Sequence, residues 1–227
     1  MGLSLHLEIL PPAQRRLWDE LCALPGDFAL YGGTALALRL GHRNSVDFDF
    51  FSSRDLDPAR LEAEVPFLKD AKITQRERNT LSVLVEREGP VKVSFFGVPA
   101  LPRLLPPSWS SEGGIHVASL LDLAGTKASV VQMRAEAKDY IDIDALITKG
   151  GISLPAALSA AQKLYGASFN PQITLKSLSY FDDGDLRLLP DEIRQRLVAS
   201  AREVDLDHLP DIGKLVRQMG LERGLGL

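Results

Sequence analysis

Two aspartates separated by one residue, Asp47 and Asp49, lie in a segment whose sequence over residues 46–51 is VDFDFF. The alternation of acidic and apolar residues predicts a β-strand with both carboxylates on one face and the apolar side chains on the other. Two carboxylates at this spacing suit a hard divalent cation, Mg²⁺ or Mn²⁺. The alternative is a solvated face of an edge strand, but aspartate is a poor strand former and interrupts a very apolar run. We therefore predict that Asp47 and Asp49 bind a metal ion together with phosphate groups.

A glycine pair, Gly32-Gly33, precedes Thr34 between a short apolar run over 28–31 and a helix-forming stretch over 35–40. This order predicts a strand, a glycine turn and a helix. Glycine lets the backbone approach a ligand closely, and the free N–H groups at the amino end of a helix attract phosphate oxygens. Taken alone, such a pair more often makes only a tight turn.

Three cations follow in the segment 119–149, which has no proline and is predicted to form one helix from a cap at Ser119. If that helix is continuous, Lys127, Arg134 and Lys138 share one face, with Asp139 and Asp142 beside them. One interpretation is a solvated face with a Lys138–Asp142 ion pair. The other is a cationic stripe that meets the β- and γ-phosphates of a nucleotide.

Further elements must position these groups. The sequence predicts a helix over 11–24, a helix from Asp57 to about Leu68, and three antiparallel strands over 73–78, 81–87 and 91–96. A connection with four prolines follows over 97–111, and several helices are expected between 153 and 220.

The composition excludes several classes of protein. The 227 residues include 26 basic and 30 acidic ones, so no global positive field attracts nucleic acid. The single cysteine allows neither an intramolecular disulfide nor a thiolate zinc site. No run of about eighteen apolar residues is present, so we expect no membrane partner and a cytoplasmic location. No P-loop, dinucleotide-binding glycine motif or nucleophile elbow occurs.

Taken together, the motifs resemble those of a known family. The stretch Gly32-Gly33-Thr34-Ala35-Leu36 and the later stretch over 42–51, HRNSVDFDFF, resemble the first motif of the nucleotidyltransferase superfamily, in the form found in AbiEii/AbiGii-type toxins. Lys127, Arg134 and the stretch KDYID over 138–142 resemble its downstream lysine and aspartate motifs. The resemblance spans about residues 28–147.

The resemblance implies an α+β fold, with a nucleotidyltransferase-like mixed sheet flanked by helices over 1–105 and a helical region over 106–227 that completes the cleft. It implies a metal-dependent transferase, using Mg²⁺ or Mn²⁺, that moves a nucleoside monophosphate from an NTP to an RNA or protein acceptor, such as a tRNA-like molecule. A cognate antitoxin is the other implied partner.

The resemblance also implies residue roles. Catalysis would rest on Asp47 and Asp49, which hold the metal, and on three residues of the later motifs: Lys127, Asp139 and Asp142. The nucleotide would be bound by residues of both motifs: Gly32, Gly33, Thr34, Arg43, Ser45, Arg134 and Lys138.

One position departs from the family pattern. Many nucleotidyltransferases carry a third carboxylate on a following strand, and Ser94 occupies the position expected for it. A serine is not a general base at neutral pH without an activating neighbour. Asp139 or Asp142 would then have to substitute, or the protein would be a degenerate nucleotidyltransferase-fold module that binds a nucleotide or a partner. A sugar transferase, which also uses an Asp-x-Asp motif, is the third hypothesis.

Overall fold

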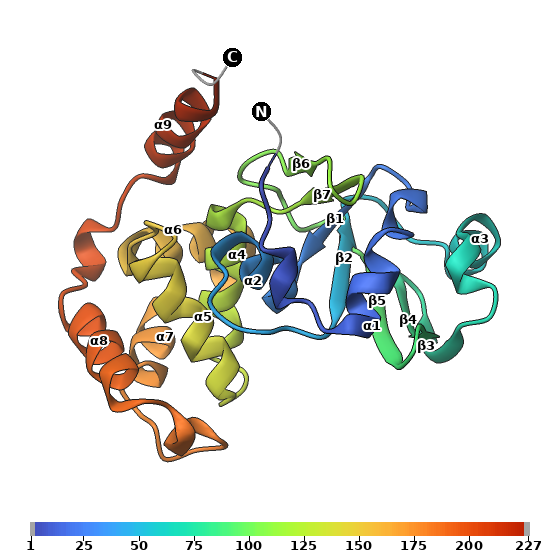
Figure 1. Ribbon diagram of the computed structural model, residues 1–227. Helices are drawn as coiled ribbons and strands as arrows, with labels where there is room; N and C mark the ends of the chain where they lie inside the picture. Colours follow the sequence, from blue (N-terminus) through green and yellow to red (C-terminus); the bar gives the residue numbers. More distant parts are fainter. Residues whose placement is uncertain (1–2, 225–227) are drawn as a thin grey trace. The chain divides into compact units, whose positions relative to one another are not determined.

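The computed structural model describes residues 3–224, which form two compact units. The first, which we call the sheet unit, comprises residues 3–102 with 106–118. The second, the helical unit, comprises residues 103–105 with 119–224. Each unit is described by itself below (Figure 1).

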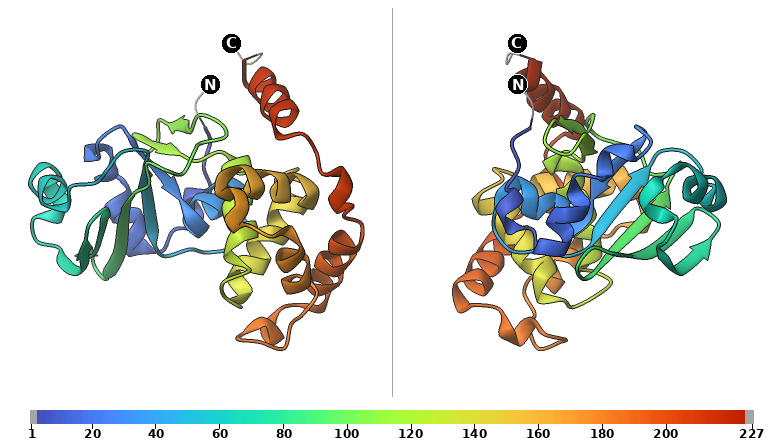
Figure 2. Two further views of the ribbon diagram at one scale, coloured as in Figure 1. Left: turned by 180° about the vertical axis from the view of Figure 1, so that it is seen from behind. Right: turned by 45° about the vertical axis from the view of Figure 1, so that its right-hand side comes forward.

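The sheet unit is built on a mixed sheet with the strand order β3-β4-β5-β2-β1-β7-β6 (Figures 1 and 2). Two neighbouring pairs, β1 with β7 and β2 with β5, are parallel, and the other neighbours are antiparallel. The bounds of the strands are β1 Phe28–Tyr31, β2 Phe48–Ser52, β3 Lys72–Glu77, β4 Thr80–Glu86, β5 Pro90–Gly97, β6 Ser108–Ser110 and β7 Ile115–Val117. The expected strands are therefore confirmed, including the three antiparallel ones.

Three α-helices belong to this unit: α1 Pro12–Trp18, α2 Gly32–Leu40 and α3 Pro58–Glu64. The helix expected over 11–24 is shorter than predicted, because α1 ends at Trp18 and a separate 3-10 turn follows. Helix α3 begins where predicted, since the Asp57 carboxylate accepts hydrogen bonds from the first free N–H groups. Helix α2 ends at Gly41, whose φ of 55° is one that glycine adopts without strain.

One face of the sheet carries the core of this unit. The rings of Phe48, Phe50 and Phe95 are fully buried, and Phe50 and Phe95 stack with centroids 5.7 Å apart. Because side chains alternate along a strand, Asp49 projects from the opposite face of β2. Burial of the phenylalanines therefore fixes the direction of the acidic side chain.

The helical unit contains α4 Leu120–Val130, α5 Ala137–Thr148, α6 Leu154–Tyr165, α7 Pro171–Ser177, α8 Asp191–Arg202 and α9 Ile212–Gly224. The predicted cap at Ser119 is confirmed, because its hydroxyl accepts the Asp122 N–H at 3.0 Å. None of the described helices is both long enough and apolar enough to cross a membrane.

The prediction of one continuous helix over 119–149 is wrong. The chain leaves the helix after Val130 and re-enters it at Ala137. The amide of Ala137 donates to the Asp185 carboxylate at 2.6 Å, so a residue far along the chain satisfies a free N–H at the start of α5. At the other end of the break, the side-chain amide of Gln132 donates a hydrogen bond to the Thr174 hydroxyl at 2.7 Å. These contacts with residues distant in the sequence therefore stabilise the break and outweigh the helix propensity of the segment.

Candidate functional site

The glycine turn of the sheet unit lies against an aspartate. Gly32 begins α2 with a φ of 70°, a left-handed conformation that glycine adopts easily. A Cβ at Gly32 would come within 2.7 Å of Asp49 Oδ2, so any larger residue would collide with that carboxylate. The register explains this closeness, since Tyr31 of β1 pairs with Asp49 of β2. Asp49 is thus held at the amino end of a helix.

Gly33 makes the second close approach. A Cβ there would overlap Nη2 of Arg43 and would lie 3.5 Å from Oγ of Ser45. The guanidinium of Arg43 also donates to the Asn44 carbonyl at 2.9 Å. The two glycines therefore bring backbone N–H groups, a cation and a carboxylate together. The N–H groups and the guanidinium are the donors suited to phosphate oxygens.

Two buried hydroxyls fix the segment that carries Asp47. The Thr34 hydroxyl is hydrogen bonded to the Asp47 carbonyl and to the Ser45 hydroxyl, the latter at 2.8 Å. A carbonyl can only accept, so the single Thr34 proton goes to Asp47 and Ser45 is the donor in the other bond. Thr34 and Ser45 are 1% and 9% exposed, whereas Asp47 is partly exposed. They tie the loop before β2 to α2.

The expected third-carboxylate position is next to Asp49. Ser94 of β5 pairs with Asp49 in the parallel register, so the two side chains project from the same face. Ser94 is buried, and its hydroxyl accepts from Ser82 Oγ at 3.1 Å. A serine held by another serine supplies no negative charge at this position.

The acidic residues at the glycine turn could serve as ligands of a divalent cation. Within residues 3–224, no three His, Cys, Asp or Glu side chains are grouped to hold a metal ion. Mg²⁺, however, usually uses one or two carboxylates and takes its other ligands from water and substrate phosphates. Asp47 and Asp49, at the anion-attracting end of α2, fit that pattern as a pair of oxygen donors.

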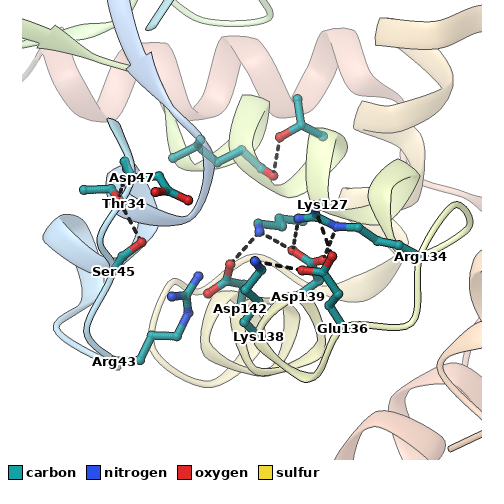
Figure 3. Close-up of polar contacts among 12 residues, drawn as sticks. Thr34, Arg43, Ser45, Asp47, Lys127, Arg134, Glu136, Lys138, Asp139 and Asp142 are labelled. Carbon is teal, nitrogen blue, oxygen red and sulfur yellow. Dashed lines mark hydrogen bonds and ion pairs between the residues drawn. The ribbon is translucent and has the colours of Figure 1, made fainter. Parts of the chain in front are cut away.

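The later motifs form a second group, inside the helical unit. Lys127 Nζ lies 2.6 Å from an oxygen of Asp139 and 2.6 Å from an oxygen of Asp142 (Figure 3). Arg134 Nε donates to the other Asp139 oxygen at 2.7 Å. We call these four residues the ion-pair cluster. Its two cations balance its two anions, and both carboxylates are fully buried.

The cluster changes the acidity of its members. Burial by itself would raise the pKa of Asp139, but the Arg134 hydrogen bond and the charge and hydrogen bond of Lys127 lower the pKa below its usual value. Burial raises the pKa of the adjacent Tyr140 to about 12, helped by the charge of Asp139. Asp139 is therefore ionised and held between two cations.

Lys138 is not part of the cluster. Its ammonium pairs with Glu136 at 2.7 Å and its side chain is 51% exposed. In place of the Lys138–Asp142 pair of the solvated-face interpretation, Lys138 pairs with Glu136 and Asp142 pairs with Lys127. The three cations thus have different surroundings rather than forming one stripe.

Sequence reasoning did not single out the aromatic residues on the face of Asp49. Phe51 follows Asp49 by two residues and pairs with Phe96 in the same register in which Asp49 pairs with Ser94. The two-residue period of the strand could have revealed that Phe51 lies on the same face as Asp49.

Known proteins resemble the chain in sequence and in fold. The sequence model of the family described as "Nucleotidyl transferase AbiEii toxin, Type IV TA system" matches residues 16–217. The uncharacterized protein aq_aa25 of Aquifex aeolicus (strain VF5) is 33% identical over 178 residues, which cover 77% of this chain and 84% of that protein.

Two solved structures share the fold. JHP933 from Helicobacter pylori gives a TM-score of 0.53 at 18% identity and covers 92% of this chain and 93% of its own. The nucleotidyltransferase toxin MenT4 from Mycobacterium tuberculosis H37Rv gives 0.54 at 16% identity and covers 83% and 82%.

Proposed function

Since the chain belongs to the AbiEii nucleotidyltransferase toxin family of type IV toxin–antitoxin systems, we propose that it transfers a nucleoside monophosphate from an NTP to an RNA or protein acceptor. The observation that supports this most directly is the position of Asp49 against the amino end of α2, where only glycine fits at residue 32. A carboxylate beside free helix N–H groups is suited to binding a cation and a phosphate chain together.

The residues of the sheet unit have distinct proposed roles. Gly32, Gly33 and Thr34 offer backbone N–H groups to the triphosphate, and Arg43 adds a positive charge. Ser45, with the Thr34 hydroxyl, holds the Asp47 loop in place.

Asp47 and Asp49 would hold Mg²⁺ or Mn²⁺. When bound, the ion would offset the negative charge of the phosphate groups.

The residues of the helical unit act mainly by position in this proposal. Lys127 and Arg134 balance the charges of Asp139 and Asp142 inside the ion-pair cluster, and the Lys127 contacts link α4 to α5 across the break. Arg134 and Lys138 are about half exposed, at 46% and 51%, and are the two cations of this unit that we propose as phosphate ligands.

The reaction itself is an in-line displacement. The acceptor oxygen forms a bond to the α-phosphorus, the bond to the bridging oxygen breaks, and pyrophosphate leaves with the electron pair. The acceptor proton passes to water, because Ser94 is not a base at neutral pH. We place the toxin, its NTP and its cognate antitoxin in the cytoplasm.

Label transfer tests the proposal. The full chain is incubated with each α-labelled NTP and total RNA or protein at several Mg²⁺ or Mn²⁺ concentrations. We expect a labelled acceptor, and Asp47→Asn should lower the rate by about 100-fold or more. Asp70→Asn, an exposed aspartate elsewhere in the sheet unit, is the matched control and should leave the rate unchanged. No labelled product with any NTP would contradict the proposal.

The buried Ser94–Ser82 hydrogen bond favours a second candidate, a nucleotide-binding or partner-binding module without turnover. Calorimetry separates the two, because this candidate predicts NTP binding without labelled product. In that case Ser94→Asp, which restores a carboxylate beside Asp49, should produce activity in a protein that otherwise has none.

A further inference from the structure

The face of the sheet that carries Asp49 also carries a row of aromatic rings. Tyr31 and Phe51 stack with centroids 4.7 Å apart and planes 13° apart. Phe51 and Phe96 meet edge to face at 5.3 Å and 70°. Because Tyr31 pairs with Asp49 and Phe51 pairs with Phe96, the row begins beside the acidic side chain and leads away from it across β1, β2 and β5.

Exposure separates this row from the aromatic core. The core rings Phe48, Phe50 and Phe95 are 0% exposed. Phe51 and Phe96, on the opposite face, are both partly exposed. Part of each of these two phenylalanines therefore lies at the surface of the unit, whereas the core rings are covered completely. We call Phe51 and Phe96 the aromatic ledge.

The spacing of the ledge matches the two ends of one kind of ligand. Phe51 lies two residues beyond Asp49 on the same strand face, a rise of about 7 Å. At one end are carboxylate, guanidinium and helix N–H groups for charged phosphates, and at the other are flat apolar rings. A nucleotide has the same division between a charged phosphate chain and a flat base.

We propose that the aromatic ledge stacks the nucleobase of the NTP whose phosphates lie at the glycine turn. This inference rests on the proposed function and adds to it the residues that bind the base. Every base has a flat π face, and no recognition group is needed for stacking, so the ledge supports binding of all four NTPs.

Calorimetry on the full chain tests the proposal with ATP, GTP, CTP, UTP and inorganic triphosphate. Phe96→Leu removes the ring but keeps an apolar side chain. We expect it to weaken binding of each NTP by about tenfold, the scale of losing one base–aromatic contact, and to leave inorganic triphosphate unchanged. Asp47→Asn should weaken both kinds of ligand.

Two further variants keep the result interpretable. Phe96→Trp retains a ring and should bind NTPs at least as tightly as the parent. Trp109→Leu removes an aromatic residue that is 51% exposed on the edge strand β6, and it should change nothing. Thermal unfolding of each variant identifies any loss of folding.

The outcomes distinguish this inference from the proposed function. If a folded Phe96→Leu protein binds NTPs as tightly as the parent, or loses NTP and triphosphate binding equally, the ledge does not hold the base. If the parent protein binds NTPs but transfers no label, and Phe96→Leu weakens NTP binding alone, the inference stands and the transferase proposal fails. If it binds no NTP, both fail.

Discussion

The carboxylates of the sheet unit and those of the ion-pair cluster have opposite surroundings. Asp47 and Asp49 are partly exposed and lie at a glycine turn that the Asp49 carboxylate approaches closely. Asp139 and Asp142 are fully buried, and Lys127 contacts both at 2.6 Å. The first pair carries charge at the surface of its unit, and the second pair has its charge neutralised inside its unit.

The difference shows how residues of the same type take different roles. A buried carboxylate whose charge is already balanced by neighbouring cations binds a metal ion weakly, and its removal mainly costs stability. A carboxylate beside free helix N–H groups contributes little to the core, and its removal should mainly cost binding and turnover. The comparison therefore predicts a separation between variants that unfold the protein and variants that inactivate it.

The largest effect should come from Lys127→Met. The change leaves Asp142 without its 2.6 Å ion pair and removes one of two cations from Asp139, in a site where neither carboxylate is exposed. Removing one partner of a buried ion pair typically costs about 3–5 kcal/mol. Urea denaturation should show a loss of unfolding free energy of this size.

Lys163→Met provides the matched control, because Lys163 is exposed on α6 in the same unit. Its effect should stay within about 0.5 kcal/mol. If the Lys127→Met and Lys163→Met proteins had the same free energy of unfolding, the cluster would not stabilise the fold. Binding of phosphate would then be the better explanation for Lys127.

A smaller effect is expected for Gly32→Ala. The alanine Cβ would come within 2.7 Å of Asp49 Oδ2, at a φ of 70° that alanine adopts only with strain. We expect a loss of about 1–3 kcal/mol in unfolding free energy, with a larger loss of NTP binding because Asp49 must move. Gly26→Ala, where a Cβ meets nothing within 4 Å, is the control and should change neither quantity.

Much of the sheet unit could be predicted from the sequence because its signals are local. The two-residue period around Asp47 and Asp49 and the glycine pair before Thr34 depend on neighbouring residues, and both gave the correct strand, turn and helix. The identification of Ser94 also depended on counting along a strand, and the register places it beside Asp49.

The helical unit was harder to predict because its decisive contacts are distant. The sequence around Val131 contains no proline or glycine that predicts a helix end. The residues that stabilise the break, Asp185 and Thr174, lie far along the chain. The pairing of Lys127 with two buried carboxylates depends on that break. A sequence that contains Lys, Arg and Asp at helical spacing cannot by itself distinguish a surface stripe from a buried cluster.

Acid should affect the ion-pair cluster in a defined direction. The pKa of Asp139 is lower in the folded protein than in the unfolded chain, so its ionised form stabilises the fold. That stabilisation is fully present above the unfolded pKa of about 3.9 and is lost as the pH falls through the lower folded pKa. Urea denaturation between pH 7 and pH 3 should show this decline.

Asp139→Asn tests the assignment of the acid response. The variant should be less stable than the parent at pH 7, and its stability should fall less between pH 5 and pH 3, because one titrating group with a lowered pKa is gone. An unchanged pH dependence would mean that other carboxylates control the acid response.

The smallest effect on stability should come from Lys138→Ala, and it sharpens the comparison because Lys138 lies next to Asp139 in the sequence. Its ammonium pairs only with the half-exposed Glu136 among the described residues, and surface pairs of this kind contribute about 0–1 kcal/mol. Urea denaturation should therefore barely distinguish the variant from the parent, in contrast to Lys127→Met.

If Lys138 nevertheless contacts phosphate, calorimetry will show that the Lys138→Ala variant binds NTP and inorganic triphosphate more weakly than the parent, with a strong dependence on salt concentration. A large loss of stability would instead mean that the charge balance of the cluster extends to its exposed neighbours.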